Sequence, residues 1–344
     1  MSNTSVNAVG ASGLIALLSM AAEADLAAFI QSQPGVGKSN IVRDLAKAWG
    51  LNFVDIRLAT RSPVDVGGYP TLSNQDGREV MKFIQTGELP ITPGNIIFLD
   101  EFSCATRATQ SAALQLVLER RIGEYVVPEN TFIVLAGNRK IDKVHVEELS
   151  SALVNRVMMI EMKPSISDWT VWANNHGLND QMIAFLEHRP ELLNDFDGAK
   201  WDKASAFATP RSWEAADRVT NTDSYKSASE MYQANALAGV IGAPASSEYR
   251  GFLKLSMALP SVKDALRDPQ GTEVPSEQSS MVAMAAALKP QTTPDNVDNA
   301  LAYLKRFPKE YEVFGVRFIF TKRELIATPA WMAWNKENEA LLAG

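Results

Sequence analysis

The sequence predicts an α/β protein: a three-layer αβα sandwich around a five-stranded parallel sheet, followed by an α-helical lid and a helical C-terminal extension. Five short apolar runs alternate with helix-like segments, and the expected strands are 26–30, 53–58, 96–99, 131–136 and 157–161. Continuous apolar strands separated by helices are typical of a parallel sheet that helices cover on both faces. From Lys163 onward the strand pattern fades. The predicted domains are therefore 1–162 (αβα), 163–250 (lid) and 251–344 (extension).

The helix-like segments and the interruptions between them complete this organisation. Helices are expected at 40–49, 108–119, 165–176, 180–188, 213–219, 229–237, 251–257, 280–288 and 297–307. The polar segments 267–279 and 289–296 are expected to be loops. Residues 65–93 are rich in Gly and Pro and predict an inserted hairpin or loop, whereas residues 122–130 predict a small hairpin before the next strand.

Composition narrows the class of protein. The 344 residues are 46% hydrophobic, which is ample for a sizeable core, and the formal charge is −7. Nucleic-acid binders usually carry a basic excess or a basic stripe, so direct DNA binding is not predicted, although a local patch in a ring pore is left open. The single cysteine, Cys104, fits a reducing cytoplasm and a structural role. The apolar stretch Gly13–Ala22 is too short to span a membrane, so we expect a cytoplasmic protein with no membrane association.

The most informative stretch is Ser32-Gln33-Pro34-Gly35-Val36-Gly37-Lys38-Ser39, which lies between an expected strand and an expected helix. This order and spacing predict a phosphate-binding P-loop, whose glycines let backbone N–H groups surround a phosphate. ATP and Mg²⁺ are the expected ligands: Lys38 would reach the β- and γ-phosphates, and Ser39 would ligate the metal. The expected nucleotide-binding residues are Gln33, Pro34, Gly35, Val36, Gly37, Lys38, Ser39 and Asn40.

Ser32 departs from the P-loop pattern, which has a glycine at this position. If the position requires a positive φ, serine there costs roughly 1–2 kcal/mol. The alternative interpretation of the whole stretch is a chance Gly-rich turn before a helix.

Two acids follow the third expected strand, Ile96–Leu99. Asp100 would hold Mg²⁺, and Glu101 would polarise the attacking water, which is the Walker B arrangement. A buried strand that ends in a solvated Asp-Glu pair is the simpler alternative. The next apolar strand ends in Asn138, which we expect to face the γ-phosphate and the water, although asparagine is also common in turns.

Two arginines are candidates for sensing or completing the site. Arg156 comes just before the fifth expected strand, and an arginine delivered to a neighbour's γ-phosphate is worth roughly 10³–10⁵ in rate. Arg211, in a Thr-Pro-Arg-Ser helix start, would sense nucleotide from the lid. Each could instead be an exposed helix-end arginine. Arg120 and Arg121 are weaker candidates for the same interface.

Together these motifs resemble those of the AAA+ ATPases, over about residues 25–215. Within that superfamily the chain is similar to the MoxR-like ATPases of the helix-2-insert clade, on the basis of Asp65-Val66-Gly67-Gly68 and the Gln110–Arg121 helix. The resemblance implies a homo-oligomeric ring, usually a hexamer, with ATP at subunit interfaces. It also implies chaperone-like remodelling of a protein client, often with a von Willebrand factor A-domain partner. Residues from about 250 to 344 match no motif.

Three other functions stay open. One is a nucleotide-switched binding or assembly scaffold with slow hydrolysis. Another is a nucleic-acid remodelling ATPase, which the acidic charge disfavours. A small-molecule kinase on the same fold is the third, and it would need neither Arg156 nor Arg211.

Overall fold

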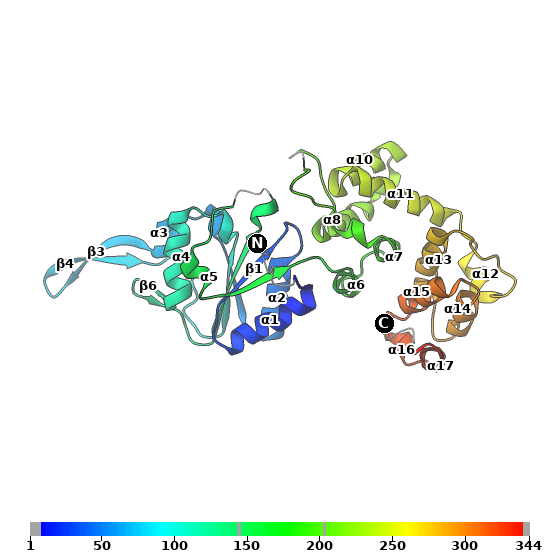
Figure 1. The fold of residues 1–344 in the computed structure, drawn as a ribbon, viewed down its shortest axis with the longest axis horizontal. Coiled ribbons are helices and arrows are strands. Elements are labelled where there is room, and N and C mark those ends of the chain that lie inside the picture. Colours follow the sequence, from blue (N-terminus) through cyan, green and yellow to red (C-terminus); the bar gives the residue numbers. More distant parts are fainter. Residues whose placement is uncertain (1–7, 143–145, 202–203, 340–344) are drawn as a thin grey trace, which may run out of the picture. The chain divides into compact units, whose positions relative to one another are not determined.

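The computed structural model describes residues 8–142, 146–201 and 204–339 (Figure 1). The chain divides into two compact units. Unit 1 comprises Met1–Ser165 and Phe196–Lys203, and unit 2 comprises Ile166–Asp195 and Ala204–Gly344.

Unit 1 is built on a five-stranded parallel sheet with the order β2-β5-β8-β1-β9. Its strands are β1 (Ala28–Ser32), β2 (Asn52–Arg57), β5 (Asn95–Asp100), β8 (Thr131–Asn138) and β9 (Met158–Met162). The first and last residues of each strand lie within two residues of the predicted ones. This confirms the predicted fold class, a P-loop NTPase-like αβα sandwich.

Helices cover both faces of this sheet (Figure 1), and each face has its own hydrophobic core. Ile96 and Phe98 of β5 pack with α1 (Ala11–Glu23) and α2 (Lys38–Ala48), whereas their neighbours Ile97 and Leu99 pack on the opposite face with α4 (Arg107–Glu119). The remaining helices of unit 1 are α3 (Pro63–Gly67), α5 (Ser151–Val154) and the short turns η1 (Leu58–Thr60), η2 (Phe102–Cys104) and η3 (Lys140–Asp142). Burial on both faces explains why these strands are continuously apolar.

The segment between β2 and β5 contains the predicted inserted hairpin, formed by β3 (Tyr69–Gln75) and β4 (Arg78–Ile84). The turn residues Asp76 and Gly77 both have positive φ, as a tight two-residue hairpin turn requires. The second predicted hairpin is also present, as β6 (Arg121–Ile122) and β7 (Tyr125–Val126).

Unit 2 is helical in the residues described. Its helices are α6 (Ile166–Asn175), α7 (Asp180–His188), η4 (Pro190–Leu193), α8 (Pro210–Thr220), α9 (Asp223–Ser227), α10 (Glu230–Ile241), α11 (Ala243–Met257), α12 (Val262–Arg267), α13 (Gln278–Gln291), α14 (Val297–Leu304), α15 (Lys309–Ile319), α16 (Arg323–Ile326) and α17 (Pro329–Glu337). The predicted loop at 289–296 is wrong in its first three residues, because α13 continues to Gln291 and buries Lys289. Helices α9, α12, α15, α16 and α17 lie outside the predicted helical ranges.

One core of unit 2 runs across residue 250, where the sequence divides lid from extension. It includes Phe185 and Trp213 from before that position and Phe252, Val282 and Phe318 from after it. Separate roles for the lid and the extension therefore stay a prediction. Within the described ranges, no helix has the length and apolar character needed to cross a membrane.

Lys289 of α13 is a buried charged residue that contacts residues of α6, α7 and α15. Its side chain is 7% exposed, and its Nζ lies 2.6 Å from Asp180 Oδ1 and 4.6 Å from the centre of the Phe318 ring. Its Nζ also donates a hydrogen bond to Asn174 Oδ1. Because a partly buried carboxylate, Asp180, loses its partner when the pair is broken, the pair should matter for stability.

We expect Lys289→Ala to lower the free energy of unfolding by about 2–4 kcal/mol, since Asp180 is left partly buried without a cation. Urea unfolding of the full chain, followed by circular dichroism, measures this change. Lys336→Ala is the matched control, because Lys336 is exposed on α17. Equal midpoints for the two variants would contradict the role given to Lys289.

Candidate nucleotide-binding site

The P-loop joins the end of β1 at Ser32 to the start of α2 at Lys38. Gly35 and Gly37 have φ of 76° and 95°, a left-handed conformation that favours glycine. Gly37 is the N-cap of α2, so the first-turn N–H groups and the helix dipole face the loop. This backbone has the form of an anion site at a helix N-terminus.

The side chains of Gln33, Val36 and Asn40 make contacts within the protein. Val36 is buried in the core, and Asn40 is exposed, with its Oδ1 accepting a hydrogen bond from Arg43. Gln33 Nε2 donates to the carbonyl of Phe196 at 3.0 Å. The predicted phosphate contacts of these three residues therefore depend on their backbone N–H groups.

The predicted metal ligands lie together. Ser39 Oγ, in the first turn of α2, donates a 3.0 Å hydrogen bond to Asp100 Oδ2 at the end of β5. A hydroxyl and a carboxylate oxygen are ligands that suit Mg²⁺, which keeps several waters and needs few protein ligands. In the described part of the chain no three His, Cys, Asp or Glu residues gather as a metal site. The donor set therefore fits Mg²⁺ bound with a nucleotide.

Glu101 directly follows Asp100 and has a strained backbone. Its φ is 54°, a left-handed value that costs a non-glycine residue about 1–2 kcal/mol. Its N–H donates to Asp100 Oδ1 at 2.8 Å, which fixes the two acids relative to each other. Strain of this kind tends to persist at functional sites.

Asn138 is held at the end of β8 by Ser103, a residue that the sequence interpretation missed. Asn138 N–H donates to the fully buried Ser103 Oγ at 2.9 Å, and Asn138 Nδ2 lies 3.9 Å from Cys104 Sγ. Ser103 also accepts, at its carbonyl, a 2.7 Å bond from Glu147 N–H. Burial raises the pKa of the Cys104 thiol, which suits a structural residue better than a nucleophile.

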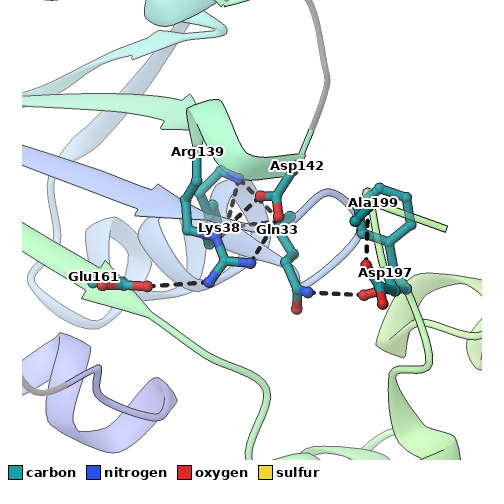
Figure 2. A network of polar contacts seen from close by, with 9 residues as sticks. Gln33, Lys38, Arg139, Asp142, Glu161, Asp197 and Ala199 are labelled. Carbon is teal, nitrogen blue, oxygen red and sulfur yellow. Dashed lines mark hydrogen bonds and ion pairs between the residues drawn. The ribbon is translucent and has the colours of Figure 1, made fainter. Parts of the chain in front are cut away.

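A second network without a sequence signal surrounds Arg139 (Figure 2). Its guanidinium donates to both carboxylate oxygens of Asp142, at 2.7 and 3.0 Å, and to Glu161 at 3.1 Å. The hydrogen bonds to Asp142 raise the pKa of Arg139. Gly198, in the segment that also meets Gln33, packs so closely on Asp142 that a Cβ would lie 2.5 Å from its carbonyl oxygen.

The four candidate arginines differ in their surroundings. Arg156 follows α5 and Arg211 opens α8 in unit 2, and both are exposed without a side-chain hydrogen bond or ion pair to described residues. Arg120 instead donates to the Thr131 carbonyl at 2.7 Å and pairs with Asp25, which is a local structural role. Arg121 donates to its near neighbour Gly123 at 3.3 Å. Within unit 1 the structure thus brings together Ser39, Asp100, Glu101 and Asn138 at one sheet edge, whereas Arg156 lies at the opposite end of the sheet, before β9.

The sheet order and the loop after β1 define unit 1 as a P-loop nucleotide-binding domain. Residues 27–159 match the model of the family described as ATPase family associated with various cellular activities (AAA). A search of curated proteins finds no significant match to the chain.

Two solved structures illustrate the structural likenesses. A mutant of RuvB from Thermotoga maritima has 15% identity and a TM-score of 0.42, over 81% of this chain and 83% of that chain. NtrX from Brucella abortus has 14% identity and a TM-score of 0.40, over 91% of this chain and 69% of that chain.

We expect Gly137→Ala to displace Asn138 and to lower the melting temperature by several degrees. The added Cβ would lie 2.6 Å from Ser103 Oγ and 3.0 Å from Phe29 Cζ, so the strand end must shift. Differential scanning calorimetry measures the shift. Gly67→Ala is the control in the same unit, since its Cβ would meet no heavy atom within 4 Å. A Gly137→Ala protein as stable as this control would contradict the close packing.

Proposed function

We propose that the protein is a Mg²⁺-dependent ATPase that hydrolyses ATP at the interfaces of a homo-oligomeric ring. The observation that carries this proposal is the Ser39–Asp100 hydrogen bond, because it joins the P-loop to the strand that bears Glu101. Ser39 and Asp100 would hold Mg²⁺, which supplies positive charge that neutralises the phosphates. Lys38 would bind the β- and γ-phosphates.

The remaining residues would act on the attacking water and on the developing charge. Glu101 would accept the proton of that water, and Asn138 would orient it. Arg156 of one subunit would stabilise the transition state in the site of the next, and Arg211 would sense the γ-phosphate from the lid. The exposed, unpaired state of these two arginines among the described residues supports such roles, since neither is used for local structure.

We further propose a MoxR-like remodelling or assembly role, in a ring expected to be a hexamer, acting on a protein client in the cytoplasm. The support is the β3–β4 hairpin that follows Asp65-Val66-Gly67-Gly68, and the small hairpin after α4. A von Willebrand factor A-domain protein is the proposed partner. Copurification from the native source would test whether such a metal-binding protein accompanies the chain.

We expect Glu101→Gln to bind MgATP as the wild type does and to lose about 10²–10⁴-fold in kcat, because the amide cannot accept the proton from water. Isothermal titration calorimetry gives the affinity, and phosphate release gives the turnover. Glu79→Gln, on the exposed hairpin, is the control. Wild-type-like turnover of Glu101→Gln would refute the assignment and favour a site that uses another base.

Arg156→Ala should lose about 10³-fold or more in kcat while its affinity for MgATP stays close to that of the wild type. Arg78→Ala, at the exposed end of β4, is the matched arginine control. The decisive measurement mixes the two inactive proteins, Arg156→Ala and Glu101→Gln.

In such mixed rings, a site with intact Glu101 can receive Arg156 from its neighbour, so part of the activity should return. Activity that stays absent in the mixture, or full activity of isolated monomers, would show that Arg156 acts within its own subunit or only in folding.

A further inference from the structure

Ser32, the residue that departs from the P-loop pattern, holds the P-loop lysine. It is fully buried, and its Oγ accepts a 2.7 Å hydrogen bond from Lys38 Nζ. The same hydroxyl donates to the Gln33 carbonyl at 2.8 Å, and Lys38 Nζ lies 3.5 Å from that carbonyl. A glycine at this position would offer the lysine no side-chain acceptor.

The sheet fixes the position of this hydroxyl. Ser32 is the last residue of β1 and is paired with Asn138 of β8 on one side and Met162 of β9 on the other. Because its only hydroxyl hydrogen is directed to the Gln33 carbonyl, the oxygen lone pairs are left to accept from the ammonium. The strand register therefore fixes where Ser32 lies, and the Gln33 carbonyl fixes the direction of its hydroxyl hydrogen.

We infer that Ser32 is a positioning residue, which holds the Lys38 ammonium in place for the phosphates of a nucleoside di- or triphosphate. This inference rests on the proposed nucleotide-binding function. An ammonium has three N–H donors, so Lys38 can keep its bond to Ser32 while it donates to phosphate oxygens. A lysine side chain that is already held loses less rotamer freedom on binding, and this preorganisation strengthens affinity.

The test compares Ser32→Ala with the wild type for binding of MgATP, MgADP and AMP by calorimetry. Loss of one hydrogen bond to a charged group should weaken MgATP and MgADP about fivefold to tenfold. AMP lacks the phosphates that Lys38 reaches, so its affinity should not change. Equal weakening of all three nucleotides, as a general disturbance of the loop would give, overturns the inference.

A double-mutant cycle with Lys38→Met adds a second readout. If Ser32 acts through Lys38, Ser32→Ala should change MgADP affinity in the wild-type background and not in the Lys38→Met background. An equal effect in both backgrounds, or none in the wild type, overturns the inference alone. A wild-type protein that binds no nucleotide overturns the proposed function as well.

Discussion

The parallel register of β5, β8 and β1 is the constraint on which the candidate site depends. Leu99 is paired with Leu135, and Ser32 is paired with Asn138, so three strands end at the same edge of the sheet. Their carboxyl ends deliver the P-loop, the Asp100-Glu101 pair and Asn138 to one region, where ligands of open α/β sheets bind. A shift of one strand by one residue would turn Asp100 into the core and separate it from Ser39.

The sequence predicts this sheet well because its strands are buried on both faces and are therefore apolar throughout. It predicts the C-terminal helices poorly for a physical reason that α15 illustrates. This helix contains Val, Phe and Ile residues and Gly315, all of which have low helix propensity. Packing against α14 stabilises this helix instead of intrinsic propensity. A Cβ on Gly315 would lie 2.9 Å from Leu304 Cδ2, so the glycine permits a close contact between the two helices. This contact exists only in the folded unit.

At the site, the residues with a motif could be predicted and the residues that support them could not. Lys38, Ser39 and Asp100 stand at fixed places in a known pattern, whereas Ser103 and Asp142 reach the site through contacts that no motif marks. The expectation that Ser32 costs backbone strain applies only if φ is positive. Ser32 continues β1 and is not among the positive-φ residues, so that cost does not arise.

The charges around the site explain why one subunit alone would hydrolyse ATP poorly under the proposed mechanism. Arg139 follows Asn138 directly and is the basic residue nearest to it in sequence, but its guanidinium is neutralised by Asp142 and Glu161. Arg120 is likewise used by Asp25 and the Thr131 carbonyl. Arg156, which follows α5, is exposed and makes no side-chain hydrogen bond or ion pair to a described residue. Such an arginine is solvated before assembly and lies against phosphate afterwards. Its attraction to the phosphate is then stronger, because the dielectric constant at an interface is lower than in water. Under the proposed mechanism Arg156 is therefore available to the site of a neighbouring subunit, which assembly would complete.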